Sequence, residues 1–127
     1  MIVVPGTCSD PLSIDEFEQY AETYLPKNAF DYYASGANDN QSLQENRSAF
    51  SRLRIMPRVM RDVSNIDMST TILGEKIQLP ICAAPTAMHK MAHPEGECGT
   101  AIACARAMTG MILSSLSSTA LEVCYYL

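Results

Sequence analysis

The sequence predicts an α/β fold in which short buried strands alternate with helices. Two short segments, Ile81–Ala84 and Met111–Ser114, are largely apolar, which is typical of strands buried on both faces of a parallel sheet. A stretch with helical spacing separates them, and a further helical start follows at Ala120. The order strand, helix, strand, helix predicts parallel strands joined by right-handed crossovers.

The helix between the two strands is predicted over residues 93–110, with a glycine as its stop. Pro94 suits a first helical turn, and the carboxylates of Glu95 and Glu97 complement the positive end of the helix dipole. The hydroxyl-bearing residues 117–119 follow the second strand. We expect them to cap the next helix.

The N-terminal part of the chain is predicted to be helical after a loop. Residues 1–12 are rich in Pro, Gly, Ser and Asp, so we expect them to be flexible. Ser13 and Glu16 match a capping box at a helix start. The predicted helices span residues 13–25, 27–37 and 42–50, with Pro26 between the first two and Gly36 near the end of the second.

The pattern then changes from helical to alternating spacing. Pro57 interrupts residues 55–63, so no regular element is predicted there. Ser69–Leu73 is rich in Thr and Ile, and Lys76–Leu79 alternates polar and apolar residues. Gly74-Glu75 between them suits a two-residue turn with glycine first. We therefore expect a small β-hairpin.

Two parallel strands with apolar faces on both sides cannot bury themselves, so the sheet requires further β/α repeats. A (β/α)₈ TIM barrel takes roughly 250 residues, and residues 81–127 hold about two repeats. The sequence therefore predicts an incomplete (β/α)₈ barrel, with N-terminal helices, a hairpin and the first two β/α units. We expect the chain to be the opening portion of a larger enzyme.

Composition excludes several functions. The chain has 127 residues, 47% of them hydrophobic and 18% charged, as in a globular protein, and its net charge of −5 argues against nucleic-acid binding. No apolar run approaches a membrane span, and no secretory or peroxisomal signal is recognised. The five cysteines are spread without a Cys-x-x-Cys pair, so we expect reduced, buried thiols, no metal site and no catalytic cysteine.

Three separated motifs carry a resemblance to a known family. They are DYYASGAND at 31–39, NRSAFSRLRIMPRVMRDVS at 46–64 and APTAMHKMAHPEGE at 84–97. Together they resemble the FMN-dependent 2-hydroxy-acid dehydrogenase and oxidase family, most closely its glycolate oxidases, also called hydroxyacid oxidases. The likeness runs from about residue 14 to 123 and covers the first third of such an enzyme.

The resemblance implies FMN as cofactor and oxidation of an (S)-2-hydroxy acid such as glycolate, with oxygen reduced to hydrogen peroxide. Pro85, Thr86 and Ala87 match family positions whose main chain lies against the flavin. Ser114 matches a serine that hydrogen-bonds the polar edge of the flavin, and Tyr32 matches a tyrosine that contacts the substrate carboxylate. Taken without the family, these residues fit an ordinary turn, a helix cap and a core aromatic better than a cofactor or substrate role.

The same resemblance implies that this chain lacks catalytic residues. The family's histidine base and carboxylate-binding arginine lie near the end of the barrel, and no position here corresponds to either. We interpret His89 and His93 as structural or solvent-facing. The family commonly has Ser-Ser-Trp where this chain has Ser114-Ser115-Leu116, and the chain has no tryptophan, which affects the shape of the substrate pocket.

Several alternatives remain open from the sequence. The chain could be a non-catalytic truncated product with at most an interaction role, and the parent enzyme could transfer the α-hydrogen by base-assisted proton removal or as a hydride. Another FMN barrel, such as an isomerase, is disfavoured by the Tyr32 motif. The family also implies a homo-oligomeric parent and a peroxisomal location.

Overall fold

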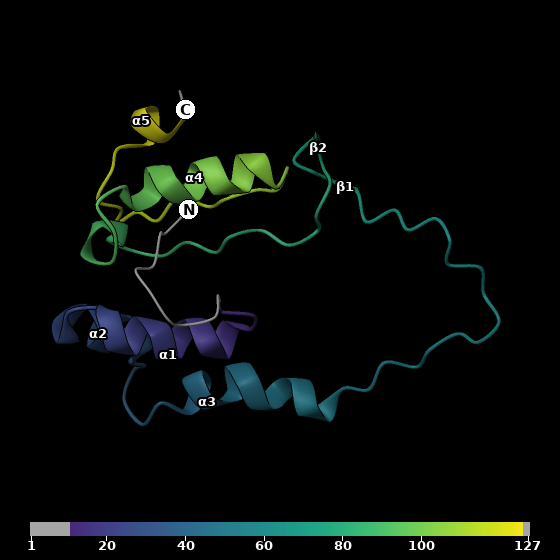
Figure 1. Cartoon of the computed structure of the whole chain (residues 1–127), viewed down its shortest axis with the longest axis horizontal. Helices are drawn as coiled ribbons and strands as arrows, with labels where there is room; N and C mark the ends of the chain where they lie inside the picture. Colours follow the sequence, from purple (N-terminus) through teal and green to yellow (C-terminus); the bar gives the residue numbers. More distant parts are fainter. Residues whose placement is uncertain (1–10, 126–127) are drawn as a thin grey trace. The chain divides into compact units, whose positions relative to one another are not determined.

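The computed structural model describes residues 11–125, and the chain divides into two compact units at residues 54 and 55. Each unit is described by itself (Figure 1). Residues 1–12 are predicted to be flexible, but residues 1–10 of this segment lie outside the described part of the chain. Within residues 11–125 no helix is long and apolar enough to cross a membrane.

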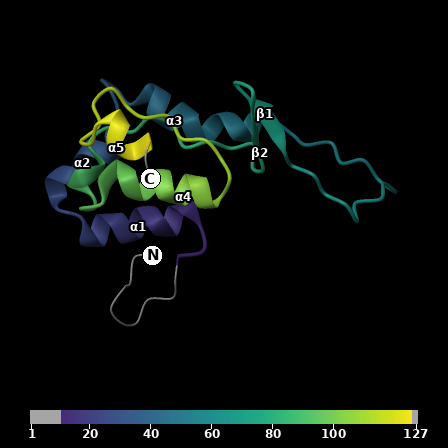
Figure 2. The same cartoon turned by 90° about the horizontal axis from the view of Figure 1, so that it is seen from above.

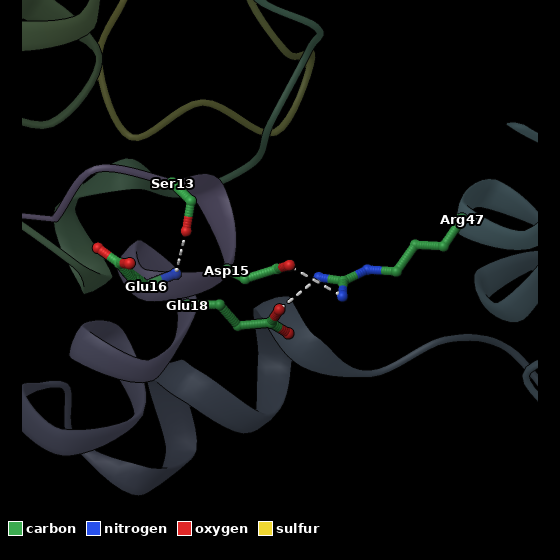
Figure 3. Close-up of polar contacts among 5 residues, drawn as sticks. All are labelled: Ser13, Asp15, Glu16, Glu18 and Arg47. Atoms are coloured by element: carbon green, nitrogen blue, oxygen red, sulfur yellow. Dashed lines mark hydrogen bonds and ion pairs between the residues drawn. The ribbon is translucent and has the colours of Figure 1, made fainter.

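The first unit begins with helix α1, Ile14–Tyr24, and its capping confirms the prediction. The hydroxyl of Ser13 accepts a hydrogen bond from the main-chain N–H of Glu16 at 3.2 Å (Figure 3). The Glu16 carboxylate accepts from the N–H of Leu12 at 2.7 Å, one residue before the position used in the standard capping box. These bonds satisfy N–H groups that have no partner inside a helix.

Helix α2 spans Lys27–Ala34 and ends three residues before its predicted end. Helix α3, Gln41–Ser48, continues into the 3₁₀ turn η1, Ala49–Arg52. The chain between α2 and α3 places Asn38 and Asn40 at positive φ, 49° and 58°, a conformation that asparagine adopts more readily than most residues. This turn, and not continued helix, therefore occupies residues 35–40.

An ion-pair cluster joins α1 to α3 within the first unit. The guanidinium of Arg47 lies 3.0 Å from the Asp15 carboxylate and also contacts Glu18 (Figure 3). All three side chains are at least half exposed, so water and salt screen their attraction. The cluster therefore links the two helices but adds little to the stability of the unit.

The second unit begins with a segment without helix or strand, followed by the hairpin of β1, Thr70–Ile72, and β2, Glu75–Ile77 (Figures 1 and 2). The strands are antiparallel, with Ile72 opposite Glu75. The hairpin is confirmed, but its turn is Leu73-Gly74 and not Gly74-Glu75. Both turn residues have positive φ, 52° and 89°, as a type I′ turn requires.

We expect Leu73→Asn to stabilise the hairpin by about 0.5–1 kcal/mol, because asparagine tolerates positive φ and leucine does not. The Leu73 side chain is fully exposed, so the substitution removes no buried contact. Amide hydrogen exchange at Ile72 and Glu75, the pair that flanks the turn, measures the change. Leu53→Asn, another exposed leucine but with negative φ, is the control. Faster exchange in Leu73→Asn than in the original chain would contradict the prediction.

The two predicted parallel strands pair in the expected direction but form only one bridge, between Ala83 and Met111. Ile81 and Ile112 are 69% and 57% exposed, so the predicted burial on both faces is wrong for this chain. The reason is that the described residues supply no further strand beside either segment. A ladder needs neighbours on both sides to become a buried sheet.

Helix α4 spans Gly96–Arg106, and α5 spans Leu121–Tyr125 (Figure 1). The 3₁₀ turn η2, His89–Met91, precedes α4. Helix α4 is shorter than predicted at both ends. Pro94 and Glu95 precede it, and Met108 at φ 50° ends helical geometry before Gly110. Gly110 instead takes part in the parallel pairing, where its carbonyl accepts from Ala83.

Apolar burial is sparse in the described residues, with Ala29 and Ile77 as the buried apolar side chains. The four described cysteines are free, as expected, but partly exposed and not buried. They are Cys82, Cys98, Cys104 and Cys124, and the fifth, Cys8, lies outside the described residues. No group of His, Cys, Asp and Glu able to hold a metal occurs in residues 11–125.

Candidate functional site

Two loops lie beside one another at the ends of the paired segments. The N–H of Ala83 donates to the carbonyl of Gly110 at 2.9 Å, and the N–H of Ile112 donates to the carbonyl of Ala83 at 3.0 Å. Further along, the N–H of Met88 donates to the carbonyl of Leu116 at 3.1 Å. The loops of residues 84–88 and 113–116 therefore start beside one another, after the pairing at Ala83, and are joined at their far ends by the bond from Met88 to Leu116.

Pro85, Thr86 and Ala87 lie in the first of these loops, and Pro85 and Thr86 are exposed. The Thr86 hydroxyl donates to the carbonyl of Ala84 at 3.3 Å, which keeps the side chain on its own loop. The main-chain N–H of Thr86 has no hydrogen-bond partner within residues 11–125. An exposed loop with an available main-chain donor fits the expectation of close approach by a flat, polar-edged ring.

Ser114 lies in the second loop and is partly buried. Its hydroxyl oxygen accepts from the N–H of Leu116 at 3.1 Å, and its carbonyl accepts from Ser117 at 3.1 Å. The hydroxyl thus forms a local turn and not the helix cap that was the alternative, and it can still donate its proton, which is compatible with the cofactor role. Leu116, where the family commonly has tryptophan, is 64% exposed.

Tyr32 belongs to α2 in the first unit and is described within that unit alone. Its side chain is 43% exposed, and its ring meets Tyr33 edge-on, with centroids 5.4 Å apart. The interpretation of Tyr33 as a packing residue agrees with its lower exposure. The Tyr32 phenol is accessible, as a donor to a small anion must be.

Both histidines have structural hydrogen bonds. The Nδ1 atom of His89 lies 3.1 Å from the Thr100 hydroxyl, while its Nε2 atom is buried without a hydrogen-bond partner in the described residues. Nδ1 of exposed His93 accepts from the N–H of Glu95 at 3.2 Å, just before α4. These contacts agree with the interpretation of both residues as structural.

Sequence reasoning missed the most connected side chain of this region, Glu97. The sequence pattern indicates only a helix-dipole role for this residue, but it is fully buried and accepts hydrogen bonds from the residues just after both loops, His89 and Ser118. Ser118 and Thr119 were expected to cap the following helix, and their hydroxyls instead donate to Glu97. A cluster of three hydroxyl residues after the second strand was the available signal.

A scan against family models matches residues 21–125 to the FMN-dependent dehydrogenases. The chain belongs to this family, whose cofactor is FMN. Over 110 residues it is 56% identical to the glycolate oxidase of Spinacia oleracea, and over 114 residues 51% identical to an L-lactate oxidase of Nostoc sp.. It is 46% identical over 111 residues to 2-hydroxyacid oxidase 1 of Homo sapiens.

The chain spans about a third of the length of these relatives. The aligned part is 87% of this chain but 30% of the Spinacia oleracea protein, and 90% against 31% for the Nostoc protein. Among solved structures, a crystal structure of mandelate oxidase matches with a TM-score of 0.87 and 34% identity, covering 91% of this chain and 34% of that chain. The likeness to solved structures therefore extends over nearly the whole chain.

Proposed function

We propose that this chain supplies part of the flavin and substrate site of an FMN-dependent (S)-2-hydroxy-acid oxidase built on a (β/α)₈ TIM barrel. Residues 1–127 would form the N-terminal part of the FMN hydroxy acid dehydrogenase domain. The observation that carries the proposal is the pair of loops, 84–88 and 113–116, joined side by side beyond a parallel strand pairing. In barrel enzymes the active site is built from loops that follow the strands.

The reaction removes two electrons and two protons from the substrate's hydroxyl-bearing carbon and its hydroxyl, leaving the 2-oxo acid. Bound FMN supplies the two-electron acceptor, and oxygen with two protons becomes hydrogen peroxide. The Thr86 N–H and the Ser114 hydroxyl would donate hydrogen bonds to the polar edge of the ring, where electron density rises on reduction. Ala87, with its small side chain, would allow the main chain close to the ring.

Tyr32 would hold the other reactant. Its phenol can donate a hydrogen bond to the carboxylate of a small 2-hydroxy acid, glycolate being the substrate that the Spinacia oleracea relative's name indicates. For this role the residue must be accessible, and Tyr32 is 43% exposed. The catalytic base and a carboxylate-binding arginine would come from outside these 127 residues, so the chain by itself would be inactive. The parent would be a homo-oligomer located in peroxisomes.

The experiment places residues 21–125 in the Spinacia oleracea glycolate oxidase instead of the matching segment. The purified fusion is expected to bind FMN and to oxidise glycolate with formation of peroxide, at a rate within about tenfold of the unmodified enzyme. The unmodified enzyme and an empty-vector preparation are the controls. A folded fusion, shown by circular dichroism, that takes up no FMN would overturn the proposal.

Variants of the fusion separate the roles of the two sites. Tyr32→Phe is expected to raise KM for glycolate by about 10–100-fold, the value of one hydrogen bond to a charged group, without weakening FMN binding. Ser114→Ala is expected to weaken FMN binding by about tenfold and to leave KM unchanged. Tyr24→Phe, an exposed tyrosine of α1, is the control. An unchanged KM in Tyr32→Phe would remove that residue from the site.

A further inference from the structure

Glu97 joins three segments of the second unit. The residue lies in the first turn of α4 and is fully buried. Its Oε1 atom accepts from the N–H of His89 at 3.1 Å and from the N–H of Ser118 at 2.8 Å. Its Oε2 atom accepts from the hydroxyls of Ser118 and Thr119 at 2.8 and 2.9 Å. One carboxylate therefore connects the helix to the chain just after both loops, at His89 and at residues 118–119.

Ser118 extends the connection by one further hydrogen bond. While its hydroxyl donates to Glu97, its oxygen accepts from the main-chain N–H of Lys90 at 3.1 Å. In the turn η2, just after the first loop, His89 is thus bonded to Glu97 directly and Lys90 through Ser118. Every group that contacts the Glu97 carboxylate donates a hydrogen bond to it, as suits a charged carboxylate. Hydrogen bonds to a charged acceptor are about twice as strong as those between neutral groups.

The electrostatics of the site agree with this geometry. Burial raises the pKa of Glu97, but hydrogen bonds from Ser118, from the main chain of Glu97 itself and from His89 lower it more, so the pKa falls from 4.5 to about 2. Glu97 is therefore an anion throughout the neutral range. It lies in the interior as a connector, without an exposed face through which it could transfer a proton to a substrate.

Glu97 bonds to the chain directly after the candidate flavin loop. The candidate flavin loop, 85–87, begins after the bridge at Ala83 and ends at Met88, which adopts a left-handed conformation with φ 51°. Nonglycine residues adopt this conformation at a cost, so neighbouring contacts must maintain it. The bonds that do so are the one from Met88 to Leu116 and, one residue on, the one from His89 to Glu97.

We propose that Glu97 is a positioning residue for the flavin, which sets the spacing between the loop of residues 85–87 and Ser114. The inference rests on the proposed function. The strand bridge holds the chain just before both loops and Glu97 holds it just after them, so the Thr86 N–H and the Ser114 hydroxyl are presented as one preorganised pair of donors. Preorganised donors do not have to reorganise when charge develops on the bound ring.

The test compares three substitutions in the glycolate oxidase fusion. Glu97→Gln replaces one of the two carboxylate oxygens by an amide NH₂ group, which cannot accept the hydrogen bonds that the neighbouring groups donate. Ser118→Ala removes the bridging hydroxyl but keeps the hydrogen bond from the main-chain N–H of residue 118 to Glu97. Glu95→Gln, an exposed glutamate two residues earlier, is the matched control. FMN affinity is measured by fluorescence titration, the flavin midpoint potential by spectroscopic redox titration, and stability by thermal unfolding.

We expect Glu97→Gln to weaken FMN binding at least about tenfold and Ser118→Ala about threefold, each with a shifted midpoint potential, while Glu95→Gln changes neither. If Glu97 is only structural, its substitution lowers the unfolding temperature but leaves the FMN affinity and the flavin midpoint potential of the folded protein unchanged. That result would overturn the inference. If Glu97→Gln does not fold, Ser118→Ala decides by the same two readouts. An unmodified fusion that fails to bind FMN would instead refute the proposed function.

Discussion

The 127-residue chain, assayed by itself with added FMN and glycolate, is expected to form no hydrogen peroxide above the buffer background. The described histidines are both committed to structural contacts, His89 with Thr100 and His93 with Glu95. No other position matches the family's base, and removal of a general base alone lowers rates by about 10²–10⁴-fold. Without the carboxylate-binding arginine that the family resemblance implies, the rate should be lower still.

A peroxide-coupled assay on the purified chain measures this, with the glycolate oxidase fusion at equal concentration as positive control. Solubility must be checked in the same samples, because Ile81, Ile112 and Leu121 are each more than half exposed and open sheet edges promote association. Gel filtration should show aggregates for the chain and a defined peak for the fusion. Glycolate-dependent peroxide from a monodisperse chain would show that the activity resides within residues 1–127.

Local signals in the sequence were sufficient where a single residue type dictates local geometry. Ser13 and Glu16 predicted the start of α1 because their spacing places one hydroxyl on one specific N–H. Pro26 likewise separated α1 from α2, since proline has no N–H to continue a helix. The sequence pattern predicts the hairpin turn one residue too late, because glycine suits the first position of a turn, whereas Gly74 takes the second position and Leu73, at positive φ, the first.

Properties that depend on tertiary contacts could not be read from the sequence. The apolar runs at 81–84 and 111–114 predicted buried strands, but burial depends on neighbours that the described residues do not supply. Glu97 resembled any acidic residue in a first helical turn, because its partners lie 8, 21 and 22 positions away. The candidate loops were located by family motif, while their attachment to one another emerged only from the hydrogen bonds.

Acid should weaken the second unit through Glu97 in a defined pH range. The pKa of this carboxyl is about 2 in the folded protein against an ordinary value of 4.5. Above pH 4.5 the group is ionised in both folded and unfolded states, so its stabilising contribution is complete. As the pH falls from 4.5 towards 2, the unfolded chain takes up a proton that the folded chain does not, and the contribution is lost.

Urea unfolding of the fusion, followed by circular dichroism at a series of pH values from neutral to about 3, measures this loss. Glutamine does not titrate, so the difference in unfolding free energy between the original chain and Glu97→Gln should be constant above pH 5. Below pH 5 this difference should shrink. The ratio of the two unfolding equilibrium constants should then change by up to about tenfold per pH unit. Ser118→Ala removes hydrogen bonds that lower the pKa of Glu97 in the folded protein. It should therefore narrow the pH range over which the stabilising contribution of Glu97 is lost. A pH-independent difference would mean that Glu97 has the same proton affinity in both states, and its carboxylate would then not be the charged connector of the two loops.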